Sequence, residues 1–571
     1  MARSRAGAML ALVAVTALGA AVRFWRLDIP PSWLDESVTA LIAAGRGPDA
    51  MPLGRVVPLQ HVADIFDPHP SATAADALAV FRDPRVQDLH PPTFHLLANA
   101  MLRAGLFSDR PLVARVRALA VLFGIATIVV TFFAARHAFD DRTALTAAAL
   151  VAVSPYAVML SREARNYSAA MLFTACSTWA LLALVRRIES RRAGAALWMA
   201  WTAVCAAGLY VHYFTLFACL AQACALAFVA WRARSTSALA WLAISCLAVT
   251  ALFVPWVPTL IAQQASPEQR WLSFAVAETN GIDTPYLIAS AFQTMLLGKA
   301  WDLGEPVYTI TRSIALIIYL ATLAAVAYAM VRLSPAAAGG RSARLVFAVV
   351  GLTALEYAGA TLLLQKAFLS EVRYLYAFYV PFAIGVAWAF ARLPSPAIPA
   401  LIAASLANTV MVDLDHETWK GTDPPPVVAR LTDAPRPTLI VAGSASFNET
   451  VVYETILNEF VRQRGVDGRE VAVVQRTPRY ASLDIHSNPA LFWAALGRLR
   501  PDVLPASVMV HSAGMRPADY QKTLIVTSTA GATTTCSGEM LDDAAFAGDH
   551  QMIRPLYRLY RCGARTAAAE P

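Results

Sequence analysis

The sequence predicts a mainly α-helical, polytopic transmembrane bundle with a long first outer loop and a small C-terminal α/β domain. Three observations support this fold class. Apolar stretches long enough to cross a bilayer occupy most of residues 8–411. Of the 571 residues, 57% are hydrophobic and only 15% are charged, and the mean hydropathy is +0.50, outside the balance of soluble domains. Beyond residue 411, short apolar runs alternate with polar segments.

The first span and the basic loops predict the orientation. Ala8–Val22 follows Arg3 and Arg5 and lacks a small-residue cleavage site, so we interpret it as an uncleaved span that starts inside. About eleven spans are expected in all, the others near residues 112–133, 143–160, 167–185, 194–211, 213–231, 238–256, 310–331, 345–364, 374–392 and 396–411. The basic loops between them then all lie inside, and the odd count places the C-terminal domain outside. We expect a multi-pass protein of the inner (plasma) membrane.

The charge and the cysteines agree with this placement. The formal net charge of +8 comes largely from loops between spans, so we expect no nucleic-acid partner. Five of the seven cysteines lie in apolar stretches and behave as small hydrophobic residues. Cys536 and Cys562 lie in the polar tail and would form one disulfide in an oxidising compartment.

Composition also predicts the domain boundaries. We expect a membrane domain over 1–411, a linker over 412–426 and an extracytoplasmic α/β domain over 427–571. The first outer loop covers 27–110, and its segment 92–107 is only 16 residues long, so a juxtamembrane helix is favoured over a span. In the tail, apolar runs such as 437–442 and 471–474 alternate with amphipathic stretches such as 449–463 and 489–499. This domain is interpreted as a binding or scaffolding domain.

The first outer loop opens with Asp35 and Glu36, directly after the first span. A carboxylate beside an apolar surface acts as a general base when its pKa is raised, and otherwise binds a metal ion or a developing cation. The alternative is structural, with Asp35 as the N-cap of a helix over Ser37–Ala44. Both roles are compatible with one residue.

The same loop closes with His90-Pro91-Pro92. Histidine transfers protons or binds metal ions, and the two prolines would hold the imidazole of His90 at one depth. The alternative is that the prolines only start the following helix. The loop also holds other acids and histidines, but their spacing matches no metal-binding pattern, and the metal question stays open; they are His61, Asp64, Asp67 and His69.

Arginines form the third group of candidates. If 161–167 is helical, Glu163 and Tyr167 share a face and Arg162 lies near Arg165, where two guanidinium groups would bind a phosphodiester. A salt bridge to Glu163 is the competing interpretation. Arg373 and Tyr374 lie at a similar outer position before the tenth span, and His212 lies between the fifth and sixth spans. The sequence His212-Tyr213-Phe214 is also typical of aromatic anchoring at the membrane interface.

The order of these motifs over residues 1–411 resembles the GT-C superfamily of integral membrane glycosyltransferases, in particular the aminoarabinose transferase and protein O-mannosyltransferase branch. The resemblance implies transfer of a sugar from a polyprenyl-phosphate donor to a lipid, glycan or protein acceptor of the cell envelope. It implies Asp35 as the catalytic carboxylate with Glu36 beside it, and His90 at a less secure position where some relatives have Lys. The donor phosphate would be bound by Arg162, Arg165 and Arg373. Other expected pocket residues are Glu163, Tyr167, Tyr374 and His212.

The resemblance implies no certain cofactor and leaves a divalent metal ion open. The alternative function is a lipid or glycan transporter or flippase without transferase chemistry. Transporters place ionisable groups near the bilayer midplane. Here the spans are nearly free of charge, with Glu356 as the main exception, and the polar candidates gather at one face. The sequence therefore favours the enzyme.

Overall fold

The computed structural model describes most of the membrane helices and the strands of a C-terminal sheet. The described residues are 2–30, 32–51, 56–67, 72–86, 88–192, 194–264, 295, 324, 327–328, 331, 339–364, 366, 368, 372–393, 396–414, 438–444, 470–475, 496, 498–502, 504–512, 521–540 and 557–563. The chain divides into two compact units. The membrane unit comprises Met1–Leu27, Leu89–Phe94 and Arg117–Glu417, and the sheet unit comprises Asp28–Asp88, His95–Val116 and Thr418–Pro571.

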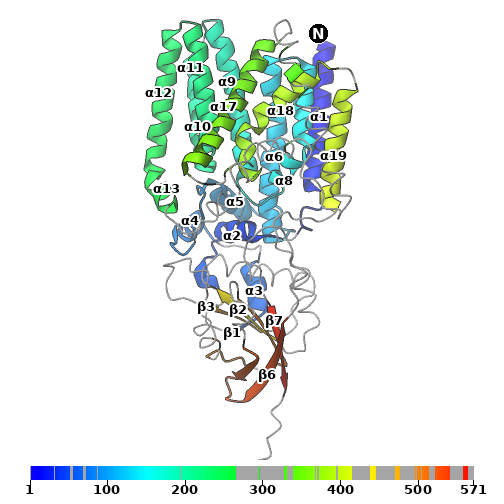
Figure 1. Ribbon diagram of the computed structural model, residues 1–571, viewed down its shortest axis with the longest axis vertical. Coiled ribbons are helices and arrows are strands. Elements are labelled where there is room, and N and C mark those ends of the chain that lie inside the picture. The colour runs from blue at the N-terminus through cyan, green and yellow to red at the C-terminus, as the bar shows by residue number, and fades with distance from the viewer. Residues whose placement is uncertain are drawn as a thin grey trace, which may run out of the picture. The chain divides into compact units, whose positions relative to one another are not determined.

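The membrane unit is a bundle of long apolar helices (Figure 1). They are α1 (Ala2–Phe24), α6 (Leu112–Ala138), α7 (Asp141–Val153), α8 (Pro155–Ser161), α9 (Tyr167–Glu189), α10 (Ala195–Val211), α11 (Thr215–Arg232), α12 (Thr236–Phe253), α13 (Val257–Gln264), α17 (Gly340–Leu364), α18 (Tyr376–Phe390) and α19 (Ala397–Leu414). Among the described residues, seven helical segments are long and apolar enough to cross a membrane, or eight with the bent pair α7 and α8. The protein is therefore a multi-pass membrane protein.

Most of the expected spans coincide with helices. Only the expected span 310–331 lies almost wholly outside the described residues. Two other expected spans coincide with apolar helical segments of 10–17 residues, Ala195–Val211 and Ala397–Val410. The number of eleven spans stays a prediction for these reasons.

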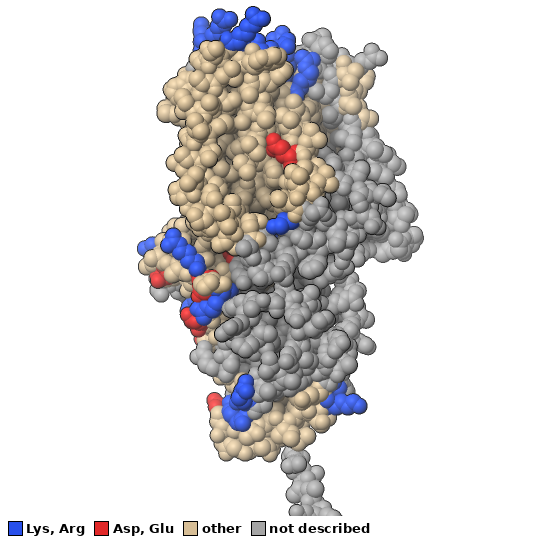
Figure 2. Space-filling view, turned by 60° about the vertical axis from the view of Figure 1, so that its left-hand side comes forward, with Lys and Arg blue, Asp and Glu red and all other residues tan. Residues whose placement is uncertain are grey.

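The interior of the bundle is mostly apolar, and many of its exposed basic residues gather at one end. All fifteen residues of α18 are buried, which makes it a central helix. A large apolar cluster around Trp198 and Trp201 joins residues of α9, α10, α11, α12 and α17. Lys and Arg side chains gather at one end of the bundle (Figure 2), where α6, α9 and α11 each have at least one arginine in the last turn. We call this the basic end.

One span is broken, and a buried arginine binds the break. Between α7 and α8 the chain bends by 57° at Ser154-Pro155. Pro155 has no N–H, so the carbonyl of Val151 cannot receive its usual helical hydrogen bond. The guanidinium of Arg23, fully buried on α1, donates instead to Val151 O (2.8 Å) and to Ala152 O (2.7 Å). A charged side chain thus replaces the missing amide donors inside an apolar bundle.

The sheet unit contains residues from both ends of the chain. Its helices are α2 (Leu34–Ala43), α3 (Gln60–Ile65), α4 (Ala74–Arg82) and most of α5 (Thr93–Arg103). Its strands are β1 (Val56–Pro58), β2 (Thr438–Ser444), β3 (Glu470–Gln475), β4 (Ser507–Ser512), β5 (Thr523–Thr527), β6 (Thr533–Met540) and β7 (Tyr557–Gly563). The sheet has the order β1-β3-β2-β4-β7-β6-β5. β2 is parallel to β3 and β4, and the other pairs are antiparallel.

Two features of this sheet bear on expectations from the sequence, one on the first outer loop and one on the cysteines of the tail. Val56–Pro58, within the first outer loop, pairs with β3, so this loop contributes an edge strand to the C-terminal sheet. Cys536 and Cys562 face each other on β6 and β7 and form a disulfide, as the sequence predicts for an oxidising compartment. The expected amphipathic stretch 449–463 and most of 489–499 lie outside the described residues.

Candidate functional site

The arginine-rich motif at 161–167 is a bend, not the continuous helix considered from the sequence. α8 ends at Ser161, and α9 begins at Tyr167. The amide side chain of Asn166 holds the bend by donating to Val211 O at the end of α10 (2.6 Å). Because the segment is not helical, the expected pairing of faces at spacings of three and four does not occur here.

The two arginines of this bend have different partners. Arg162 Nη2 donates to the carbonyls of Trp25 (3.0 Å) and Arg26 (3.3 Å), directly after α1. Arg165 Nη2 lies 2.7 Å from His90 Nδ1, and both side chains are buried. Arg162 therefore binds the residues that follow the first span. Arg165 connects the bend at 161–167 to the His90-Pro91-Pro92 motif.

The contact with Arg165 defines the protonation of His90. A guanidinium only donates, so His90 Nδ1 must accept and the ring must be neutral with its proton on Nε2. His212 has the same requirement, because its Nδ1 accepts from the Phe214 N–H (3.2 Å). The two imidazole rings lie 4.9 Å apart between centroids. Both are held neutral by donors beside them.

Aromatic rings connect this pair to the tenth expected span. The ring of Tyr167 lies 6.1 Å from that of His90 and 6.2 Å from that of Tyr374. His212 lies 5.9 Å from Tyr374. The guanidinium of Arg373 lies 5.4 Å from the Tyr374 ring centroid, a cation–π distance. Residues from four distant segments thus form one buried cluster within the membrane unit, which we call the arginine–histidine cluster: His90, Arg165, Tyr167, His212, Arg373 and Tyr374.

Sequence reasoning missed a supporting chain of hydrogen bonds. Gln263 on α13 donates from Nε2 to His90 O (3.3 Å) and accepts from the hydroxyl of Tyr213. Trp256 Nε1 in turn donates to the Tyr213 hydroxyl (2.8 Å). Trp256 and Gln263 had no motif to mark them. Tyr213 belongs to the His212-Tyr213-Phe214 motif, which is also typical of aromatic anchoring.

The cluster combines positive charge with apolar surroundings. Arg165 and Arg373 are about 95% buried, and the histidine and tyrosine rings that contact them carry no negative charge. Electrostatic attraction is several times stronger at such a site than in water. Glu163, in the same bend as Arg165, is also buried. The arrangement is suited to binding an anion by planar guanidinium groups.

The expected catalytic carboxylates lie on α2 of the sheet unit. α2 begins at Leu34 with Trp33 as its N-cap, so Asp35 lies in the first turn and is not the cap considered from the sequence. Asp35 is half-buried and Glu36 is buried. Asn99 on α5 fixes the other end of α2 by donating to Ala43 O (2.9 Å). A carboxylate in the first turn is favoured by the helix dipole and is held at a defined place.

A second buried pair in the sheet unit was also missed. His95 Nε2 lies 3.1 Å from Asp88 Oδ2, and both side chains are almost fully buried. Asp88 lies two residues before His90, and His95 lies inside the expected juxtamembrane helix, which the structure shows as α5; no motif marks either residue. The two residues flank the segment that carries His90-Pro91-Pro92. In the described part of the chain, no group of three or more His, Cys, Asp or Glu side chains is arranged to hold a metal ion.

Part of the chain matches a known protein family. Residues 89–258 match the family model of dolichyl-phosphate-mannose-protein mannosyltransferases. Among solved structures, the chain is similar to ArnT from Cupriavidus metallidurans in the apo state, with 12% identity, 97% of this chain and 98% of that chain covered, and a TM-score of 0.46. It is also similar to the apo oligosaccharyltransferase of Archaeoglobus fulgidus, with 12% identity, 93% and 74% coverage, and a TM-score of 0.42. No curated protein matches the chain.

The matched region holds most of the arginine–histidine cluster. His90, Arg165, Tyr167 and His212 lie between residues 89 and 258, whereas Arg373 and Tyr374 lie beyond it. Asp35 and Glu36 lie before it. Over residues 89–258 the family match therefore confirms the resemblance to integral membrane glycosyltransferases of the GT-C superfamily that the motifs predict.

Proposed function

We propose that this protein is a glycosyltransferase that moves a sugar from a polyprenyl-phosphate donor to an acceptor at the extracytoplasmic membrane face. The observation that carries the proposal is the buried contact between Arg165 and His90, connected through aromatic rings to Arg373. The donor class follows from the name of the matched family, whose sugar is carried on dolichyl phosphate. An anion-binding cluster inside a multi-pass bundle suits a donor that is a lipid and a phosphate at once.

We assign the roles from the chemistry of each side chain, from the contacts within the arginine–histidine cluster and, for Asp35, from the sequence resemblance. Arg165 and Arg373 bind the phosphate and stabilise the charge that grows on it as the sugar leaves. His90 Nδ1 accepts from Arg165, which fixes the orientation of that guanidinium and leaves the Nε2–H of His90 as a further donor. We assign Arg162 to positioning, since its guanidinium binds carbonyls after α1. Asp35 accepts the proton of the acceptor hydroxyl, with Glu36 beside it in the first turn of α2.

Two further observations support the proposed orientation. The basic end of the bundle belongs on the cytoplasmic side by the positive-inside rule. Tyr167 starts α9 and Arg187 lies in its last turn, about 30 Å away along the helix. The arginine–histidine cluster then lies on the extracytoplasmic side. The disulfide between Cys536 and Cys562 agrees, because such bonds persist in oxidising compartments.

The experiment is a transfer assay with purified protein in nanodiscs. Labelled polyprenyl-phosphate sugar is supplied with envelope material from cells that lack the protein, and the label is followed into the acceptor fraction. We expect wild type to transfer label, and Asp35→Asn to lose about 10²–10⁴-fold in rate, the usual range for a general base. The variant should keep wild-type thermal stability, because Asp35 is only half-buried.

The same preparation tests the rival function. A lipid or glycan transporter would carry the labelled lipid across the bilayer of reconstituted vesicles without forming a labelled acceptor. We expect acceptor labelling and no accelerated movement across the bilayer. Movement without transfer, or near-normal transfer by Asp35→Asn, would contradict the proposed function.

A further inference from the structure

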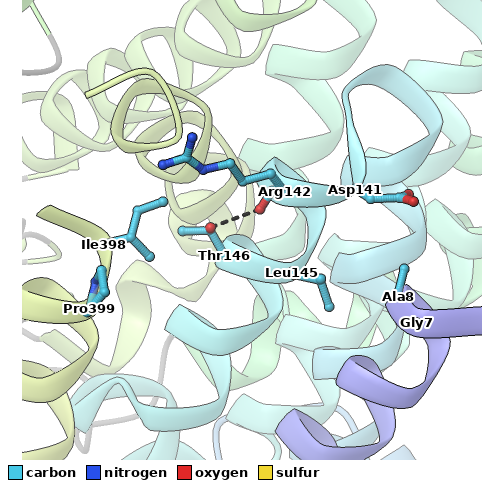
Figure 3. A pocket seen from close by; sticks show the side chains of 8 residues that line it. All are labelled: Gly7, Ala8, Asp141, Arg142, Leu145, Thr146, Ile398 and Pro399. Atoms are coloured by element: carbon cyan, nitrogen blue, oxygen red, sulfur yellow. Dashed lines mark hydrogen bonds between the residues drawn. The ribbon is translucent and has the colours of Figure 1, made fainter. Parts of the chain in front are cut away.

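A groove lies at the basic end of the bundle, and none of its lining residues belongs to the arginine–histidine cluster (Figure 3). Its volume is about 560 Å³, and it opens to the outside of the bundle. It is lined by residues of α1, α7 and α19: Gly7, Ala8, Asp141, Arg142, Leu145, Thr146, Ile398 and Pro399. The proposed transferase function uses none of them.

The helix packing creates the groove. α1 and α19 each pack against α7, so the first turns of α7 form the floor and the two other helices form the walls. Gly7 on α1 has open space where a side chain would begin, which keeps that wall set back. Apart from two charged residues and Thr146, the lining is apolar. The hydroxyl of Thr146 is engaged with the carbonyl of Arg142 (2.8 Å). The floor therefore suits hydrocarbon.

The charge at the mouth of the groove is positive. Asp141 is paired with Arg136 Nε (2.8 Å). The preceding Asp140 accepts from the Thr143 N–H (2.7 Å) and lies 3.4 Å from Arg392. Each carboxylate thus has a cationic partner of its own.

Arg142 supplies the remaining charge. Its side chain is exposed, and within the described part of the chain it makes no ion pair. Figure 3 shows its guanidinium extending toward the side of Ile398, while the carboxylate of Asp141 points toward the side of α1. The groove therefore has one exposed positive charge, that of Arg142, beside a mainly apolar lining.

We propose that this groove binds an anionic glycerophospholipid, with its phosphate at Arg142 and an acyl chain along Ala8, Leu145 and Ile398. Basic pockets between membrane helices are suited to anionic head groups, and the apolar walls select a lipid over a soluble anion. The bound lipid bridges α1 and α19, which are both packed on α7. Ligands that bind only the folded state raise its stability.

The test is native mass spectrometry of the full-length protein, titrated with phosphatidylglycerol or with phosphatidylcholine of the same acyl chains. We expect wild type to prefer phosphatidylglycerol by about fivefold, the ratio that one arginine provides at a membrane surface. Arg142→Ala should abolish the preference. Arg232→Ala is the matched control, because Arg232 is an exposed arginine at the end of α11 and does not line the groove. It should keep the preference.

A second variant tests the apolar floor. Leu145→Trp fills the groove without changing charge, so it should weaken binding of both lipids while the thermal midpoint in lipid-free detergent stays near that of wild type. An unchanged preference in Arg142→Ala would overturn the proposal. Two other results would overturn it: inorganic phosphate that competes with phosphatidylglycerol as well as a lipid does, or a polyprenyl phosphate that binds more tightly than phosphatidylglycerol and loses this affinity in Arg142→Ala.

Discussion

The two ends of the membrane unit use arginine in opposite ways. At the basic end, Arg187 and Arg232 are exposed in the last turns of α9 and α11, where a positive charge interacts favourably with the helix dipole. At the other end of α9, Arg165 and Arg373 are buried against histidine and tyrosine rings. An exposed arginine costs little, whereas a buried one loses its hydration and must be compensated. Under the proposed function, burial therefore separates the two arginines that we assign to phosphate binding from the exposed arginines of the basic end.

Arg23 is a third case and sharpens the contrast. It is fully buried and Arg165 nearly so, yet the guanidinium of Arg23 donates to backbone carbonyls at the break between α7 and α8. The break leads through α8 directly into the bend that carries Arg165. Burial of an arginine therefore needs a second criterion, namely whether its donors bind backbone carbonyls or surround a possible ligand.

The largest expected effect separates the two ends directly. Arg165→Ala should reduce transfer by about 10²–10³-fold, the usual loss when a donor to a developing anion is removed. Arg187→Ala removes an arginine from the other end of the same helix and should change the rate less than twofold. Binding of a polyprenyl phosphate, measured by native mass spectrometry, should weaken in the first variant only. Equal effects in both variants would break the comparison.

The next effect concerns Arg23 and is mainly on stability. Arg23→Ala leaves the buried carbonyls of Val151 and Ala152 without donors, which costs about 1–3 kcal/mol for each group. The free energy of unfolding should fall accordingly, as measured by thermal or denaturant unfolding in nanodiscs. Arg23→Lys keeps one donor group and should lose less. Wild-type stability in Arg23→Ala would show that the break does not depend on this side chain.

The smallest expected effect concerns the ring under Arg373. Tyr374→Leu removes the cation–π contact, which contributes about 0.5–2 kcal/mol depending on burial. Carrier binding should weaken by roughly twofold to thirtyfold on that energy range. Tyr374→Phe keeps the ring and should stay close to wild type. A strong loss in Tyr374→Phe would shift the role to the hydroxyl group.

Much of the fold could be predicted from the sequence, because bilayer crossing requires long apolar runs that hydropathy reveals directly. The helices α6, α9, α11 and α17 all follow from such runs. The sequence predicts one continuous span over 143–160. The break at Pro155 was not predicted, although Ser154-Pro155 is typical of an N-cap followed by a proline at the start of a helix. β1 could not be predicted, because three residues in a polar loop give no periodicity and their pairing partner lies more than 400 residues later.

The candidate site could be predicted only in part. The sequence names Arg165, His90, Arg373 and Tyr374, but it cannot show that they share one buried cluster, since their contacts are tertiary. The helical pairing expected within 161–167 failed because the chain bends after Ser161. Gln263 has no sequence signal at all, because an amide that contacts a backbone carbonyl belongs to no motif.

The most direct test of the central claim is a cryo-electron microscopy structure of the full-length protein in nanodiscs with a polyprenyl phosphate. We predict that the phosphate lies within hydrogen-bonding distance of the guanidinium groups of both Arg165 and Arg373, with the polyprenyl chain leading out between helices of the bundle. A phosphate bound at the basic end instead, or out of reach of both arginines, would contradict the account.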